Sequence, residues 1–164
     1  MSKILLKEFS REEYHLLWKD YVPDPIMDSQ SYQYNYDDVE NNYNNMIKNQ
    51  SWYMRVGIFL LNGYPIGEIS FKRINYEKSQ CELGIMIAND SYKSQGYGSE
   101  AIGLAIDYVF KVLKLRKIIV DTSNSNLRMQ RILKKYGFEL IQIDKQEKRL
   151  NYILINKQEN PLNY

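Results

Sequence analysis

Polar and apolar side chains alternate along several stretches of the chain, a pattern typical of half-buried β-strands. The clearest stretch runs from Gln80 to Ala88, where the side chains of Cys81, Leu83, Ile85 and Ile87 face one way and those of Glu82, Gly84, Met86 and Ala88 face the other. Six further strands are predicted, at residues 3–9, 52–61, 64–74, 117–122, 138–143 and 149–155. Asn62-Gly63 joins the second and third strands in chain order and is a strong hairpin signal.

Helices are predicted where apolar residues recur at helical spacing or capping signals occur. Ser10 stands three residues before Glu13, a capping box for a helix that begins near Arg11 and runs to about Tyr21. Three more helices are expected: at 37–49, at 98–113, and before Gly137, a favoured C-cap residue. The element order β-α-α-β-β-β-α-β-α-β-β predicts one α/β (α+β) domain over residues 1–164, with a mixed sheet and helices on its faces.

Composition and charge exclude several classes of protein. With 44% apolar and 26% charged residues, the chain can bury a core and is not intrinsically disordered. One cysteine excludes a disulfide scaffold, and a net charge of +2 gives no argument for a nucleic-acid partner. No apolar run is long enough to span a membrane, and Lys7 and Glu8 interrupt the first apolar residues, so no signal peptide is expected. The simplest expectation is a cytoplasmic protein without a membrane or nucleic-acid partner.

A glycine-containing segment opens the helix predicted at 98–113, shortly after a strand. It contains Gly96 and Gly98, and glycine allows a tight turn that exposes backbone N–H groups. The start of the helix adds unpaired donors and a partial positive charge, so the segment is suited to bind a pyrophosphate. The alternative is a simple tight turn before a helix.

Two familiar phosphate-binding motifs are compared with this segment. A P-loop needs lysine after its last glycine, and Ser99-Glu100 stands there instead. A dinucleotide-binding fold agrees better, because Gly96-x-Gly98-x-x-Ala101 matches its glycine pattern and Asp121 ends the next strand. However, residues 89–95 separate the strand from the first glycine, and too little sequence remains for a doubly wound sheet.

Residues 93–98 resemble the Arg/Gln-x-x-Gly-x-Gly/Ala loop of the GNAT superfamily of N-acyltransferases, with lysine in the first position. Residues 126–138 resemble its second signature, in which asparagine opens a helix and Gly-Phe ends it. Residues 67–71 and 82–85 are most similar to the ribosomal-protein alanine/serine N-acetyltransferase branch. The resemblance implies acetyl-CoA as cosubstrate and a mostly antiparallel sheet of about seven strands with helices on both faces.

The same resemblance implies the residues that bind the cofactor. The pyrophosphate would be bound by the loop, that is by Lys93, Ser94, Gln95, Gly96, Tyr97, Gly98 and Ser99. The pantetheine arm would pair with the free edge of the 80–88 strand, through backbone groups of Ile85, Met86 and Ile87. Asn126 is a favoured N-cap, and the resemblance adds contact with the pantetheine arm. The basic runs at 111–117 and 128–135 are solvated helix faces or, alternatively, meet the 3′-phosphate of CoA.

Transfer of an acetyl group to an amine requires a base, because a lysine-like amine has a pKa of about 10.4. Glu82 is the predicted base, since Gly84 removes bulk from the same face; a solvated residue or one paired with a lysine is the alternative. Glu68, on the preceding strand, is a weaker candidate. In many members of the family a tyrosine protonates the leaving thiolate, and Leu133 stands at that position here. Tyr136 is expected in the core, so no residue is assigned as the general acid.

The remaining candidate residues are expected to be structural. His15 is predicted to be a surface or packed residue, and a single histidine builds no metal site. Cys81 is expected to be buried and unreactive, and Trp18 and Trp52 to anchor the core. An aromatic-acidic patch could attract a cationic amine or be a solvated loop and helix start; it comprises Tyr32, Tyr34, Tyr36, Asp37, Asp38 and Glu40.

The sequence therefore predicts an acetyl-CoA-dependent N-acetyltransferase without a metal. The expected acceptor is a primary amine, either a protein N-terminus or a small amine, and the acetyl group passes to it directly in a ternary complex. The protein would be a monomer or a homodimer. A non-catalytic acyl-CoA-binding or regulatory module on the same scaffold is the alternative, which Leu133 keeps open. A dinucleotide-binding protein is the third hypothesis.

Overall fold

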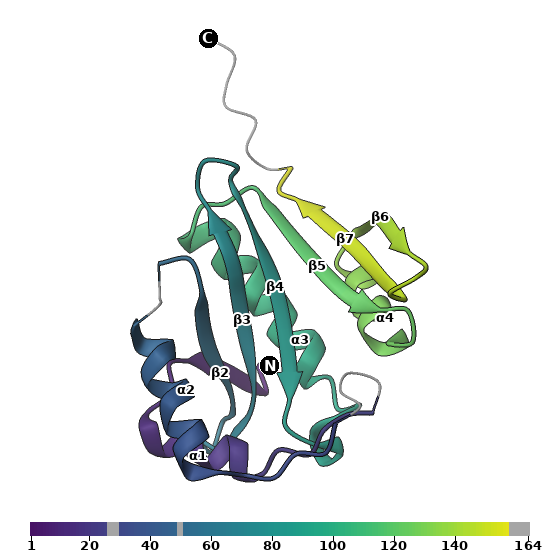
Figure 1. The fold of residues 1–164 in the computed structure, drawn as a ribbon. Coiled ribbons are helices and arrows are strands. Elements are labelled where there is room, and N and C mark those ends of the chain that lie inside the picture. The colour runs from purple at the N-terminus through teal and green to yellow at the C-terminus, as the bar shows by residue number, and fades with distance from the viewer. Residues whose placement is uncertain (26–29, 49–50, 158–164) are drawn as a thin grey trace.

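The computed structural model describes residues 1–25, 30–48 and 51–157, and its strands form one seven-stranded sheet in the order β1-β2-β3-β4-β5-β7-β6 (Figure 1). Neighbouring strands are antiparallel except β4 and β5, which are parallel. This confirms the predicted fold class. The strands are β1 (Ile4–Lys7), β2 (Met54–Leu60), β3 (Pro65–Asn75), β4 (Gln80–Ile87), β5 (Lys117–Ser123), β6 (Glu139–Asp144) and β7 (Arg149–Ile155).

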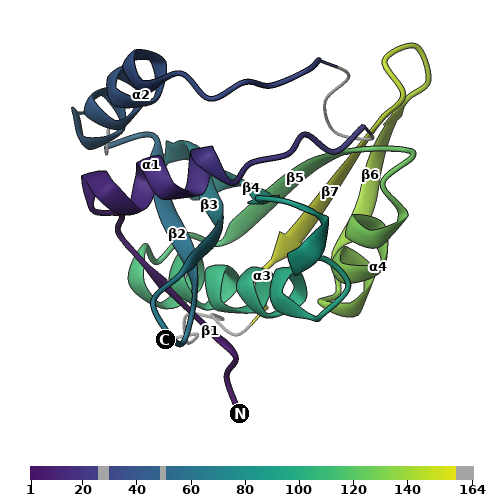
Figure 2. The ribbon, with the colours of Figure 1, turned by 90° about the horizontal axis from the view of Figure 1, so that it is seen from below.

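Helices cover both faces of this sheet, as Figure 2 shows. On one face lie α1 (Arg11–Lys19) and α2 (Tyr36–Lys48), and on the other α3 (Tyr97–Asp107) and α4 (Leu127–Lys135). Each face has its own apolar core. The larger core packs α3 and α4 against the sheet, and the smaller one packs α1 and α2 around the fully buried Tyr14 and Phe59.

Local chemistry explains where several of these elements begin. The predicted capping box at α1 is present: Ser10 Oγ accepts a hydrogen bond from Glu13 N at 3.2 Å, and Ser10 N donates to Glu13 Oε2 at 2.8 Å. The predicted hairpin between β2 and β3 is also confirmed. Gly63 there has a φ of +90°, a conformation that glycine adopts without strain.

Two expectations differ from the structure. The helix predicted at 98–113 is α-helical only to Asp107 and continues as a π-turn, in which Leu113 N donates to Tyr108 O. Val109, in this turn, is fully buried. The prediction that Trp52 anchors the core is wrong, because β2 begins only at Met54 and the Trp52 side chain is 56% exposed in the preceding turn. Trp18 does pack against the smaller core.

Strands β4 and β5 pair only over their first residues. The paired positions run from Gln80–Lys117 to Glu82–Ile119, and beyond them the two strands diverge (Figure 1). The rest of β4, through Ile87, pairs with β3 alone. Because a strand with one neighbour has unpaired N–H and C=O groups on its other side, the C-terminal half of β4 presents a free edge inside the sheet.

Candidate active site

A groove of about 490 Å³ runs between the glycine loop, the free edge of β4 and the start of α4; we call it the loop groove. Nine residues predicted to bind the cofactor line it: Ile85, Met86, Ile87, Lys93, Ser94, Gly96, Gly98, Ser99 and Asn126. Two others do not. The Gln95 side chain donates to the carbonyl of Ser91 at 2.5 Å, and the Tyr97 side chain packs against the larger core.

The backbone of the glycine loop turns sharply into α3. Gly96 is the N-cap of α3, with a φ of +86°, and as a glycine it has no side chain that could cap the helix. Ser94 also has a positive φ of +60°. Because the first N–H groups of a helix have no partner within it, the first turn of α3 offers hydrogen-bond donors at the loop groove. This is the geometry that suits a phosphate group.

The charges in the loop groove differ from what the sequence indicates. The ammonium group of Lys93 lies 2.8 Å from Asp24 Oδ2 and 3.0 Å from Asp90 Oδ1, so two carboxylates neutralise it. Burial opposes the charge of Lys93, but the two carboxylates outweigh this and raise its pKa. Arg128 and Arg131 on α4 also line the groove, which agrees with the alternative interpretation of the basic run.

Helix α4 is fixed at both ends of its apolar face. Asn126 is its N-cap and accepts a hydrogen bond from Met129 N at 3.1 Å, as predicted. The hydroxyl of Tyr136 donates to the carbonyl of Ser99 at 2.8 Å and ties α4 to the first turn of α3. Leu133 is fully buried. Tyr136 therefore has a structural contact, as expected from its spacing.

A central cavity of about 260 Å³ lies beside the free edge of β4. Three directly opposed pairs on β3 and β4 line it: Glu68–Met86, Ser70–Gly84 and Lys72–Glu82. Glu82, Gly84 and Met86 therefore share a face, as predicted. A Cβ atom at Gly84 would lie 2.6 Å from Ser70 Oγ, which explains why glycine suits this position. Tyr53, Thr122 and Met129 are further members of the wall.

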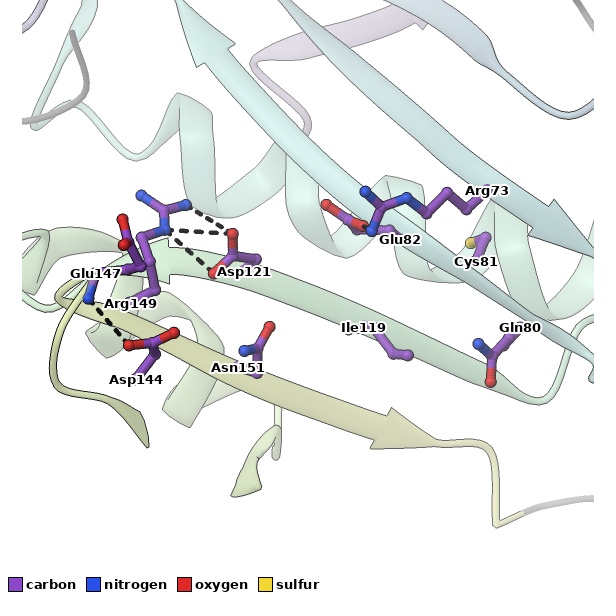
Figure 3. A pocket seen from close by; sticks show the side chains of 10 residues that line it. All are labelled: Arg73, Gln80, Cys81, Glu82, Ile119, Asp121, Asp144, Glu147, Arg149 and Asn151. Atoms are coloured by element: carbon purple, nitrogen blue, oxygen red, sulfur yellow. Dashed lines mark hydrogen bonds and ion pairs between the residues drawn. The ribbon is translucent and has the colours of Figure 1, made fainter. Parts of the chain in front are cut away.

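An outer groove of about 350 Å³ opens on the same side, over β4, β5 and β7 (Figure 3). Its charged residues are four acids and two arginines: Glu82, Asp121, Asp144, Glu147, Arg73 and Arg149. Arg73 pairs with Glu82, and Arg149 pairs with Asp121, each at 3.0 Å. Asp144 and Glu147 take part in no ion pair with the described residues, so carboxylates outnumber cations in this groove.

The three hollows lie next to one another along β4, the outer groove over its paired part and the loop groove at its free edge. The loop groove and the central cavity share Ile85, Met86 and Met129. The central cavity and the outer groove share Glu82, Asp121 and Arg149. Two molecules that enter from the two grooves can therefore meet at the central cavity.

The two candidate carboxylates have different surroundings. Glu82 is paired with a basic residue, as the alternative interpretation allowed, although the partner is Arg73 and not a lysine. Glu68 has one oxygen, Oε2, that is shielded from solvent and has no hydrogen-bond partner among the described residues. Burial raises the pKa of Glu68, against the opposing charges of Arg55 and Lys72. The alternation of Glu68, Ser70 and Lys72 along β3 could have indicated their common face.

Of the other predicted residues, Cys81 lines the outer groove, and the aromatic-acidic patch lies away from all three hollows. Glu40 of this patch is within 2.7 Å of the packed His15. Cys81 is buried as expected, and burial raises the pKa of its thiol to about 12. Within residues 1–25, 30–48 and 51–157, no helix has the length and apolar character needed to cross a membrane, and no three side chains are grouped to hold a metal ion.

Curated relatives match the chain over a limited region. It is 35% identical over 72 residues to the uncharacterized N-acetyltransferase YnaD of Bacillus subtilis, which covers 44% of this chain and 41% of that protein. It is 30% identical over 79 residues to spermidine N(1)-acetyltransferase of Escherichia coli K12, which covers 48% and 42%. The match thus spans less than half the length of these relatives.

Solved structures match over nearly the whole chain. A chimera of Vibrio cholerae spermidine N-acetyltransferase SpeG and hSSAT has a TM-score of 0.79 at 22% identity, covering 94% of this chain and 96% of the other. A candidate ribosomal-protein-serine acetyltransferase from Vibrio cholerae has a TM-score of 0.80 at 17% identity, covering 95% of both. At these identities the likeness shows the fold alone, so the ribosomal-protein branch stays a prediction. The model of the family described as "Acetyltransferase (GNAT) domain" matches residues 3–139, and the chain therefore belongs to the GNAT acetyltransferase family.

Proposed function

We propose that the protein is an acetyl-CoA-dependent N-acetyltransferase that passes the acetyl group directly to a primary amine while both substrates are bound. The observation that carries this proposal is the series of three adjacent hollows along β4, with the central cavity between the two grooves. A donor in the loop groove and an acceptor in the outer groove would meet at the central cavity. Holding both reactants there lowers the barrier by positioning them.

The residues of the loop groove suit CoA. The open N–H groups of the first turn of α3 would hold the pyrophosphate, and Arg128 and Arg131 would add charge-assisted hydrogen bonds to phosphate oxygens. The free edge of β4 from Ile85 to Ile87 would pair with the amide groups of pantetheine. CoA supplies the activated acetyl group when bound, and the backbone N–H groups of β4 can stabilise charge that develops on the thioester oxygen.

Direct transfer is also supported by the position of the cysteine. A covalent acyl-enzyme needs a nucleophilic thiolate at the site. Cys81 is 1% exposed within the larger core, and burial keeps its thiol protonated by raising its pKa to about 12. For the acceptor, the excess of carboxylates in the outer groove favours a cationic amine. A related structure from Vibrio cholerae, 20% identical, is described as a complex with CoA and spermine.

The test combines calorimetry with a thiol-release assay on acetyl-CoA and a panel of amines: polyamines, aminoglycosides and peptides with free N-termini. We expect CoA binding, turnover with at least one cationic amine, and intersecting lines in two-substrate initial-rate plots. Parallel lines would contradict direct transfer. CoA binding without turnover of any amine would favour the non-catalytic acyl-CoA-binding module, and NAD binding without CoA binding would favour a dinucleotide-binding protein.

A further inference from the structure

The central cavity contains a carboxylate oxygen that the fold leaves without a partner. Glu68 Oε2 has no contact with solvent and accepts no hydrogen bond within the described part of the chain. A buried carboxylate oxygen is ordinarily paired or hydrogen-bonded, because desolvation otherwise destabilises the charged form. Thr122 Oγ1, in the wall of the same cavity, is the second buried side-chain atom there without a partner. A donor on a bound molecule, such as an ammonium group, can complete the Glu68 carboxylate in this cavity.

The position of Glu68 along the strands separates it from Glu82. Glu68 lies directly opposite Met86, a residue that lines both the loop groove and the central cavity. Glu82 lies four residues earlier on β4, about 13 Å from Met86 at the usual rise of a strand. It also stands where β4 and β5 are still paired, whereas the edge of β4 is free only beyond it. Glu68 is therefore the carboxylate at the end of the central cavity that adjoins the loop groove, where the thioester would lie.

The neighbours of Glu68 moderate its charge without neutralising it. On β2, the Arg55 guanidinium donates to the Tyr53 hydroxyl at 2.8 Å and to the Tyr14 hydroxyl at 3.3 Å. No ion pair joins Arg55 to Glu68 within the described residues. The other charged groups that face the cavity are Lys72 on β3, Glu82 on β4, Asp121 on β5 and Arg149 on β7.

We propose that Glu68 is the general base of the acetyl transfer and that Glu82 lies on the path by which the acceptor approaches; this rests on the proposed function. The Glu68 carboxylate takes one proton from the acceptor ammonium and later releases it to solvent. The neutral amine forms the C–N bond to the acetyl carbon while the C–S bond breaks. The second proton lost by the nitrogen goes to the departing thiolate, giving the amide and free CoA.

The test compares Glu68→Gln and Glu82→Gln with Glu139→Gln, a control at an exposed position of β6. For a cationic acceptor we expect Glu68→Gln to lower kcat by about 10²–10⁴-fold, the range for loss of general base catalysis. In wild type, kcat should rise with pH as the Glu68 carboxylate ionises. In Glu68→Gln this rise should be replaced by one at higher pH, where the acceptor ammonium itself loses its proton, and calorimetric CoA binding should be unchanged. Glu82→Gln should mainly raise KM for the amine and retain the rise of kcat with pH.

An acceptor amine whose own pKa is below 7 provides a sharper readout. Such an amine is already neutral at pH 7, so the activity ratio between wild type and Glu68→Gln should shrink markedly, which a merely structural role of Glu68 would not produce. Glu68→Asp keeps the charge and withdraws it by one methylene group. Glu68→Asp should have a lower kcat than wild type, but its kcat should still rise with pH as in wild type. This variant tests the proposal even if Glu68→Gln does not fold.

A readout independent of activity uses stability. Because burial raises the pKa of Glu68 in the folded state, its contribution to stability is present at low pH and is lost as the pH rises through that pKa. Glu68→Gln should abolish this loss. The proposal is overturned if wild type is active and Glu68→Gln keeps the kcat and pH profile of wild type. It is also overturned if the pH profile of kcat is lost in Glu82→Gln but not in Glu68→Gln. An inactive wild type that binds CoA instead contradicts the proposed function.

Discussion

Replacement of Thr122 by valine should make the folded protein more stable and the site less effective. The Thr122 side chain is 2% exposed, and its Oγ1 has no hydrogen-bond partner among the described residues. A buried polar group without a partner costs about 1–3 kcal/mol, and valine has the same shape without the hydroxyl. We therefore expect the free energy of unfolding to rise by about 1–2 kcal/mol. For a domain of this size, that corresponds to a Tm increase of roughly 2–8 °C.

Calorimetric unfolding of wild type, Thr122→Val and Thr122→Ser measures this effect. Serine keeps the hydroxyl and removes the methyl group, so it should lower the Tm and serves as the matched control. If bound acetyl-CoA forms a hydrogen bond with the Thr122 hydroxyl, the Tm increase that acetyl-CoA causes should be smaller in Thr122→Val than in wild type. A valine variant that is less stable than wild type would refute the reasoning, because the hydroxyl would then have a partner in the folded protein.

Three further predictions concern the loop, the central cavity and α1. Gly96→Ala forces a left-handed φ on alanine, which should cost about 1–2 kcal/mol and weaken CoA binding in calorimetry, although the added Cβ meets no other atom. Gly84→Ala should lower the Tm, and Ser70→Ala in the same chain should restore it by removing the close Oγ. Burial opposes the charge of Glu13, but hydrogen bonds with Lys7 and Ser10 outweigh it and lower the pKa of Glu13. The free energy of unfolding should therefore fall as the pH drops through this lowered pKa. Urea unfolding should show a smaller fall in Ser10→Ala than in wild type.

Local signals in the sequence were sufficient for most of the fold. The capping box of Ser10 and Glu13 and the Asn62-Gly63 hairpin depend on residues only a few positions apart. They can therefore be predicted from the sequence without knowledge of tertiary contacts. The glycine loop is also local, and most of its residues line one groove; their binding of a cofactor stays a prediction. Trp52 shows the limit: a bulky apolar side chain is expected inside, but the strand begins two residues later.

Contacts between distant segments were outside the reach of the sequence pattern. Lys93 was expected to bind the pyrophosphate, yet Asp24, far away in the chain, pairs with it. The pair forms because the fold brings Asp24, shortly after α1, beside the glycine loop. Arg128 and Arg131 could be interpreted in two ways from their spacing alone, and the packing of α4 against α3 placed them in the loop groove.

The two glutamates show most clearly what each level of structure decides. Alternation along the chain determines that Glu82, Gly84 and Met86 share a face, because successive side chains of a strand point to opposite sides. Alternation carries no information about register, so only the pairing of β3 with β4 places Glu68 opposite Met86. Tertiary packing likewise gives Glu82 an arginine partner and leaves Glu68 Oε2 with none. A free hydrogen-bonding group is defined by everything that surrounds it, which is why the folded structure alone reveals it.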